Sequence, residues 1–205
     1  MVEGIQRSGS CKNTRLPVTR ELLIAYYQFC ICSSQFQCSL FKSVFSLAFH
    51  DMLRVGALTV DSKCAKNHTV TVNNVSVSNA ILDIYLATSK TDQDGSGTIL
   101  QICPQENQNV CPVFAFLDYV KVRPLVEGPL FCHFDGRPLS KYQFSGLLKK
   151  SHAVLGLAEA NFKSHSFRVC TTTTLAMEDM SDENIIFFGR WNSNSSYLRY
   201  IRIPN

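Results

Sequence analysis

The order of apolar and polar residues predicts helices near the start of this chain. Thr19 is a suitable N-cap, and the apolar residues after it recur at the spacing of one helical face as far as Cys30. A second helix is expected over about residues 37–53, where the apolar stripe is wide enough to indicate burial on most sides. Residues 1–15 are polar, contain several Gly and Ser, and show no periodicity, so we expect a leader ahead of a folded domain at residues 16–205.

In the middle of the chain the apolar period changes from helical to alternating. Residues 68–77 alternate around a turn at Asn73-Asn74, residues 80–87 are typical of a second strand, and residues 98–103 of a returning strand. The polar segment 90–97 contains two glycines and separates the last two strands, which predicts a hairpin tip. We therefore expect a small antiparallel sheet.

Helical spacing returns in the second half. Residues 112–122 and 140–152 are each expected to form a helix, and residues 129–134 a short strand or extended segment. A last helix should follow residue 191 and run through residues 195–202. Further start signals are Pro112, Ser140, Ser164 or His165, and Ser181. The predicted fold class is α+β, mainly α-helical with a small antiparallel β-sheet.

Composition and charge narrow the class of protein. The 205 residues are 45% hydrophobic and 18% charged, which excludes a disordered chain. No apolar run approaches the roughly 18 residues of a membrane span, and the polar first 20 residues lack the apolar core of a secretory signal. The sequence therefore predicts a protein that neither spans a membrane nor is secreted. The net charge of +4 is a weak indication of a polyanionic partner.

Cysteine usage indicates free thiols. The chain has nine cysteines, an odd number, and no secretory signal, so we expect mostly buried thiols in a reducing compartment. Cys30, Cys32 and Cys38 lie close together, but no second ligand pair follows at the spacing of a zinc finger. No carboxylate cluster suited to a metal is evident either, so we predict neither a metal nor another cofactor.

The residues that could carry chemistry are ordinary when each is taken alone. Arg54 follows a buried helix, where an arginine is usually a cap or a surface charge, and Lys90 lies at the predicted hairpin tip, where a lysine is usually solvated. His165 and Arg168 are three residues apart and so share a helical face. The single tryptophan, Trp191, would ordinarily belong to the core.

Together these residues resemble the catalytic constellation of the tyrosine recombinases, the phage-integrase family. The set, in chain order, is Arg54, Lys90, His165, Arg168, Trp191 and Tyr200. In that family the tyrosine follows a His or Trp by nine residues, a spacing that selects Tyr200 over Tyr197. The resemblance covers about residues 15–203, and the strings Gly-Arg-Trp at 189–191 and Tyr-Ile-Arg at 200–202 are most similar to recombinases of eukaryotic mobile elements.

The resemblance implies DNA recombination and integration by transesterification. The oxygen of Tyr200 would attack a backbone phosphodiester of double-stranded DNA, forming a 3′-phosphotyrosyl link and releasing a 5′-hydroxyl. Arg54 and Arg168 would stabilise the charge on the non-bridging oxygens. His165 would accept the phenol proton, and Lys90 would protonate the leaving oxygen. Trp191 can donate only its indole N–H, so it would hold a phosphate oxygen. Further protomers on the DNA, and a location in the nucleus of a eukaryote or otherwise the cytoplasm, are also implied.

Departures from the family leave alternatives open. The acidic residue that often stands three positions after the first arginine is Ala57 here, and the N-terminal helical domain that clamps DNA is expected to be absent. A catalytically degenerate DNA-binding relic of a mobile element is therefore the main alternative. A type IB topoisomerase shares the chemistry, but that enzyme has a large clamp, which makes it the less favoured reading.

Overall fold

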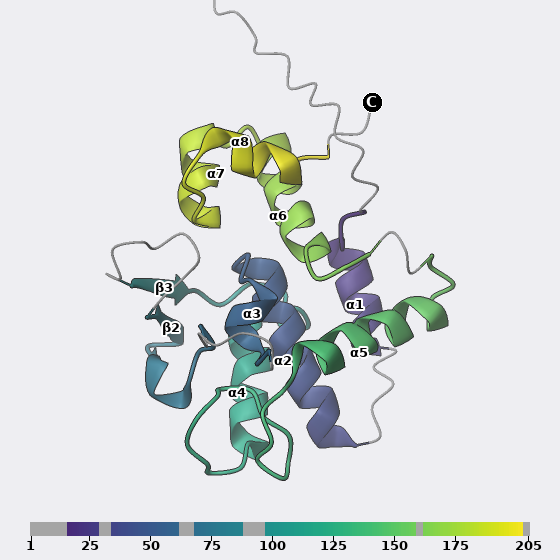
Figure 1. Cartoon of the computed structure of the whole chain (residues 1–205), viewed down its shortest axis with the longest axis vertical. Coiled ribbons are helices and arrows are strands. Elements are labelled where there is room, and N and C mark those ends of the chain that lie inside the picture. Colours follow the sequence, from purple (N-terminus) through teal and green to yellow (C-terminus); the bar gives the residue numbers. More distant parts are fainter. Residues whose placement is uncertain (1–15, 29–33, 62–67, 88–96, 159–161, 203–205) are drawn as a thin grey trace, which may run out of the picture.

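A buried central helix organises the domain. The computed structural model describes residues 16–28, 34–61, 68–87, 97–158 and 162–202. Helix α2 (Gln35–His50) packs against α4 (Pro112–Val122), α6 (Ser166–Met177) and the shorter α1 (Arg20–Gln28). Its wide apolar stripe is the reason, since Leu40, Val44 and Leu47 are fully buried. In Figure 1 the other elements surround this helix, with the strands on one side and α5 (Lys141–Val154) on the other.

The predicted sheet is present and antiparallel. Strands β1 (Val75–Ser78), β2 (Ile81–Leu86) and β3 (Thr98–Ile102) form a three-stranded sheet in chain order. On β2, the side chains of Leu82, Ile84 and Leu86 are buried while the residues between them are more exposed, as alternation requires. The prediction of a small antiparallel β-sheet in a mainly α-helical fold is confirmed.

The strand predicted over residues 68–77 is only partly correct. Residues Val72–Asn74 form a short 3-10 helix, η1, and the strand begins at Val75. The reason is local, because the Asn74 side chain accepts hydrogen bonds from the backbone N–H and the hydroxyl of Thr71, at 3.0 and 2.8 Å. Such side-chain bonds compete with a strand ladder. The extended segment at 129–134 makes only isolated bridges, Thr71 to Pro129 and Cys132 to Pro138.

Most helix boundaries follow the predicted signals. Ser140 caps α5 by accepting from Gln143 N, and Ser181 caps α7 (Asp182–Gly189) by accepting from Asn184 N. The prediction of one long last helix is wrong. Helix α8 (Asn194–Tyr197) is a single turn that passes into the 3-10 helix η3 (Leu198–Tyr200). With about three residues per turn, residues 197 and 200 share one face. Their rings both lie within 6.3 Å of the Trp191 ring, which explains the tightening.

The C-terminal elements form a small second core. Met52, Ala176, Ile185, Trp191 and Tyr197 cluster together, separate from the larger core around α2. Figure 1 shows α7 and α8 as a cap at one end of the molecule, joined to the rest by α6. Met52 follows the end of α2 and packs into this small core. Through Met52, the cap formed by α7 and α8 is therefore attached to the loop that leads to Arg54.

The structure also bears on membrane spans, metal ligands and cysteines. Within the part of the chain that the structure describes, no helix is long and apolar enough to cross a membrane. In the same residues, no group of three His, Cys, Asp or Glu side chains could hold a metal ion. Among the residues that the structure describes, the free thiols are Cys38, Cys103, Cys111, Cys132 and Cys170.

Candidate functional site

Arg168 is the buried centre of the site. It lies in the first turn of α6 and is only 2% exposed. Its Nη1 donates to the carbonyl of Met52, and its Nη2 donates to the carbonyl of Gly189 at 2.7 Å. One guanidinium thus ties the end of α2 to the end of α7, two segments that are far apart in the sequence. The fork-shaped donor geometry of arginine suits this double bridge.

Two aromatic rings cover the same guanidinium. The Arg168 Cζ atom lies 4.6 Å from the ring centroid of Trp191 and 5.5 Å from that of Tyr200. The two rings are 5.3 Å apart. Such contacts stabilise the cation and hold the rings in place. Trp191 is therefore both a core residue and a site residue, because the small core forms one wall of the site.

Tyr200 points its hydroxyl at His165. Tyr200 Oη lies 3.1 Å from His165 Nδ1, and their rings are 5.9 Å apart. His165 is the N-cap residue of α6 and is exposed, so a large partner can reach it. The backbone of this segment is fixed by Thr173, whose Oγ1 donates to Tyr200 O at 3.3 Å and accepts from Arg202 N at 3.0 Å. Tyr200 is therefore already placed in the site.

Arg54 approaches the site from the opposite wall. It is the N-cap residue of the short helix α3 (Val55–Leu58), reached after Met52 turns the chain with a positive φ of 47°. Burial lowers the pKa of Arg54, and the nearby Tyr200 opposes that shift. Among the described residues, no carboxylate is found in an ion pair with Arg54. Ala57, at the position where the family often has an acidic residue, is half-buried against the main core.

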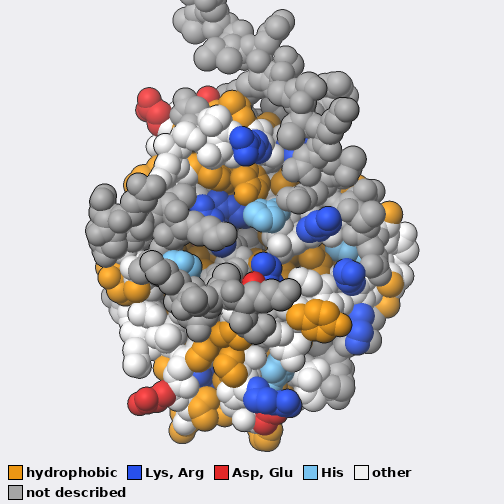
Figure 2. Space-filling model, viewed as in Figure 1, with side chains coloured by type: hydrophobic (Ala, Val, Ile, Leu, Met, Phe, Trp, Pro, Cys, Tyr) orange, Lys and Arg blue, Asp and Glu red, His pale blue; other side chains and the backbone are white. Residues whose placement is uncertain are grey.

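The site concentrates three guanidiniums, and the one carboxyl named among the causes of their pKa shifts is that of Asp51, beside Arg190. Burial, together with the charges of Arg54 and Arg190, lowers the pKa of Arg168 to about 9. Burial also lowers the pKa of Arg190 to about 10. Guanidiniums that repel one another in a poorly solvated place are stabilised when an anion enters. Figure 2 shows Lys, Arg and His side chains grouped below the α7–α8 cap, with Asp and Glu mostly toward the ends of this face.

A cleft of about 700 Å³ opens beside Arg190 and Trp191. One wall is strand β3, and the other is the end of α7 with the turn that follows it. The strand ends Leu86 and Thr98 both line it, so the described residues on either side of the connection between β2 and β3 border the same cleft as Trp191. Lys90 belongs to that hairpin and lies outside the described residues.

Five of the six predicted site residues come together, and sequence reasoning missed two neighbours. His165, Arg168, Trp191 and Tyr200 are linked by the contacts above, and Arg54 lies close enough for its charge to lower the pKa of Arg168. Thr173 was missed, although the run of four threonines at 171–174 is an unusual helix interior because threonine is a modest helix former. Arg190 was also missed, and its only sequence signal is its place between Gly189 and Trp191.

Gly189 is required by the close approach of the Trp191 ring. A Cβ atom at residue 189 would overlap that ring. We expect Gly189→Ala to destabilise the fold by about 1–3 kcal/mol, as overpacking does. For a domain of this size, the melting temperature should fall by roughly 2–12 °C.

Gly146→Ala is the matched control for this prediction. Gly146 lies inside α5 with nothing within 4 Å of an added Cβ. This change should leave the melting temperature unchanged or raise it slightly, because alanine is the better helix former. Thermal unfolding followed by circular dichroism checks both variants, and equal melting temperatures would contradict the packing described here.

We compared the sequence and the fold of this chain with those of known proteins. No protein-family model matches the chain. The integrase/recombinase XerD homolog of Selenomonas ruminantium is 28% identical over 133 residues, which cover 60% of this chain and 38% of that protein. The chain therefore spans well under half the length of this relative.

Solved structures give a more extensive match. The XerH site-specific recombinase in a post-cleavage complex with difH superposes on 94% of this chain with a TM-score of 0.67 and 13% identity, covering 50% of that protein. A lambda integrase dimer bound to a COC′ core site matches 96% of this chain and 51% of that chain, with a TM-score of 0.63 and 16% identity. The Tn1549 transposon integrase in complex with circular intermediate DNA matches 97% of this chain and 64% of that chain, with a TM-score of 0.62 and 14% identity. The chain has the fold of a tyrosine recombinase catalytic domain.

Proposed function

We propose that this chain is the DNA breaking-and-rejoining domain of a tyrosine recombinase. The observation that carries the proposal is the pairing of Tyr200 Oη with His165 Nδ1 at 3.1 Å, beside the buried cation of Arg168. A phenol next to a proton acceptor and two guanidiniums is the arrangement that attack on a phosphodiester needs. The similarity to recombinases and integrases in fold and in part of the sequence supports the same proposal.

The arginines would stabilise the transition state. A phosphodiester gains negative charge on its non-bridging oxygens when a fifth oxygen bonds to phosphorus. Arg168 is held by two backbone carbonyls and two rings, so its charge is pre-positioned and needs little reorganisation. Arg54 would supply the second charge from the opposite wall.

Proton transfers would accompany both bond changes. As Tyr200 Oη attacks phosphorus, His165 Nδ1 takes the phenol proton, and the P–O bond to the 5′-oxygen breaks. The leaving oxygen then needs a proton, a role that we assign to Lys90 because the ends of its hairpin border the cleft. Transesterification conserves the bond energy, so the reversal of these steps rejoins DNA without a nucleotide cofactor.

The wider biology follows from the same proposal. The Gly-Arg-Trp and Tyr-Ile-Arg strings support an origin in a eukaryotic mobile element, in which case the domain would act in the nucleus. Because the chain spans about half of the structures that it matches, a further DNA-holding domain and other protomers would complete the recombination complex. An open reading frame for a helical domain next to this one in the genome would support this origin.

A covalent trapping experiment tests the function. The probe is a pool of nicked duplex DNAs with randomised sequence, in which cleavage near the nick releases a short strand that diffuses away. At micromolar protein we expect an adduct that survives SDS, together with a released strand bearing a free 5′-hydroxyl. DNA that binds without forming any adduct would instead favour the degenerate DNA-binding relic.

Ala57→Glu should increase the rate of adduct formation. A carboxylate here would lie on the short helix that Arg54 begins, and no carboxylate is seen to orient Arg54 among the described residues. A charge-assisted hydrogen bond contributes roughly 1.5–3 kcal/mol, which corresponds to about ten- to a hundredfold if all of it reaches the transition state.

Ala57→Gln is the control for size without charge, and it should give a much smaller increase. Single-turnover rates at saturating DNA compare both variants with the unchanged chain. If the unchanged chain is active and Ala57→Glu reacts at the same rate, another group already orients Arg54.

A further inference from the structure

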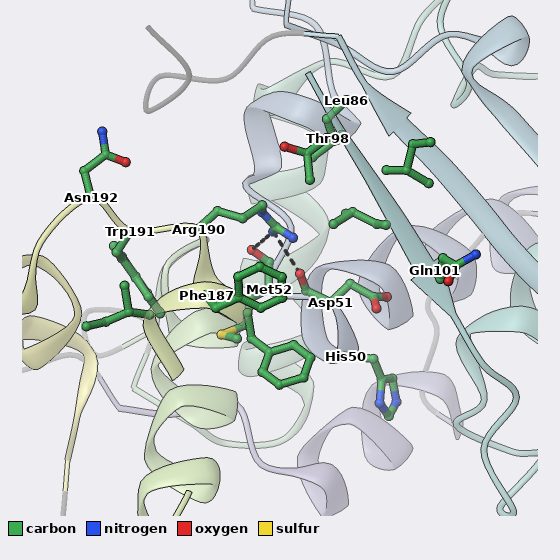
Figure 3. A pocket seen from close by; sticks show the side chains of 14 residues that line it. His50, Asp51, Met52, Leu86, Thr98, Gln101, Phe187, Arg190, Trp191 and Asn192 are labelled. Carbon is green, nitrogen blue, oxygen red and sulfur yellow. Dashed lines mark hydrogen bonds between the residues drawn. The ribbon is translucent and has the colours of Figure 1, made fainter. Parts of the chain in front are cut away.

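We infer that Arg190 is a positioning residue that fixes the loop carrying Arg54 against the turn carrying Trp191. This inference rests on the proposed function and adds a residue to its machinery. Arg190 stands between two residues that the site uses, Gly189 and Trp191, yet its own side chain reaches away from them. Figure 3 shows it extending across to the end of α2.

The contacts of Arg190 are with the backbone of the opposite wall. Its Nη2 donates to the carbonyl of Asp51 at 3.0 Å and to the carbonyl of Met52 at 3.2 Å. The Met52 carbonyl is also the acceptor for Arg168 Nη1. Two guanidiniums from different helices therefore meet on one carbonyl oxygen, which can accept both because it has two lone pairs.

That shared carbonyl is only two residues before Arg54. Met52 adopts a positive φ, and Arg54 starts α3 directly afterwards, so a rotation at Met52 would swing Arg54. Arg168 alone would hold only one backbone carbonyl of this loop, that of Met52. With Arg190 present, the carbonyls of both Asp51 and Met52 are held, and the direction of the chain into Arg54 is fixed.

The backbone conformation of Arg190 indicates that the residue is an arginine because of its side chain. Residue 190 ends α7 in the left-handed conformation, with φ of 53° and ψ of 52°. Glycine is the residue that adopts this conformation without steric cost, and an arginine here is strained. The backbone therefore gives no reason for arginine at this position, whereas the two bonds across the site do.

The neighbouring carboxyl gives Arg190 a partner of opposite charge. The Asp51 carboxyl is buried, which raises its pKa to about 7, and the charge of Arg190 opposes that shift. This attraction adds to the two backbone hydrogen bonds that hold the guanidinium at the end of α2. Arg190 would accordingly act through Arg54 and not on the DNA itself.

Arg190→Gly is the sharpest variant, because glycine keeps the left-handed backbone and removes the side chain with its guanidinium. We expect the single-turnover adduct rate at saturating DNA to fall about 10- to 100-fold, the size of effect that follows a misplacement of about 1 Å. The dissociation constant for nicked DNA should change by less than about twofold. Arg190→Lys should be intermediate, since one ammonium cannot replace the fork. Free guanidinium at low millimolar concentration should partly restore Arg190→Gly but not Tyr200→Phe.

A double-mutant cycle decides whether Arg190 acts through Arg54. In an Arg54→Ala background, Arg190→Gly should slow the reaction by less than about twofold further, because there is no Arg54 left to misplace. Full additivity of the two effects would overturn the inference, as would an Arg190→Gly protein with the rate of the unchanged chain. An unchanged chain that forms no adduct would overturn the proposed function and, with it, this inference.

Discussion

Replacing Tyr200 with phenylalanine will abolish the covalent protein–DNA adduct. The change removes one oxygen atom, which is the atom that lies 3.1 Å from His165 Nδ1. The ring remains, so its contacts with Trp191 and Arg168, at 5.3 and 5.5 Å, should persist and the fold should be unchanged. Loss of a covalent nucleophile reduces turnover by several orders of magnitude, and we expect roughly a 10⁴-fold decrease or more.

Tyr197→Phe is the matched control for this prediction. Tyr197 is 1% exposed and its ring lies 6.3 Å from that of Trp191, so it is a packing residue of the small core. Its phenylalanine variant should form the adduct at close to the normal rate. Denaturing gels with labelled DNA measure both proteins. An adduct that persists in Tyr200→Phe and disappears in Tyr197→Phe would assign the nucleophile to Tyr197.

The second large effect is expected at Arg168. A lysine has one ammonium and cannot span the carbonyls of Met52 and Gly189 that the guanidinium joins. Arg168→Lys should slow adduct formation by about 10²- to 10³-fold, the usual effect of losing one pre-positioned donor. Loss of a charged hydrogen bond should also destabilise the fold by about 1.5–3 kcal/mol. The melting temperature would then fall by roughly 3–12 °C.

Arg54→Lys separates catalysis from stability. Arg54 is half-buried and no bridge from it to another element is seen among the described residues, so its lysine variant should lose rate but keep the melting temperature. Calorimetry and single-turnover rates on the two variants make the comparison. An Arg168→Lys protein with normal rate and normal melting temperature would contradict the central place given to Arg168.

The residue types and their order were predictable because the chemistry restricts them. Arg54, the His165–Arg168 pair and Trp191 are separated by long stretches of sequence, yet the resemblance placed them in one set before any contact was known. Local signals also located the helix starts well, since capping at Ser140 and Ser181 depends on neighbours within three residues.

The missed features depend on contacts that no local sequence pattern specifies. The role of Arg190 follows from bonds to residues 51 and 52, which no local pattern reveals. The short form of the last helix also has a tertiary cause, because Tyr197 and Tyr200 both reach the Trp191 ring. Thr173 holds Tyr200 across 27 residues, so only the structure identifies it.

The most direct test of the central claim is to identify the residue that becomes linked to DNA. Trypsin cuts after Arg190, Arg199 and Arg202, so residues 197 and 200 fall into different peptides, 191–199 and 200–202. After trapping on nicked DNA and digestion with nuclease and trypsin, mass spectrometry should find a 3′-nucleotide on the tyrosine of peptide 200–202, with or without a missed cleavage at Arg199. A nucleotide on peptide 191–199 alone, or on a peptide from another part of the chain, would contradict the account.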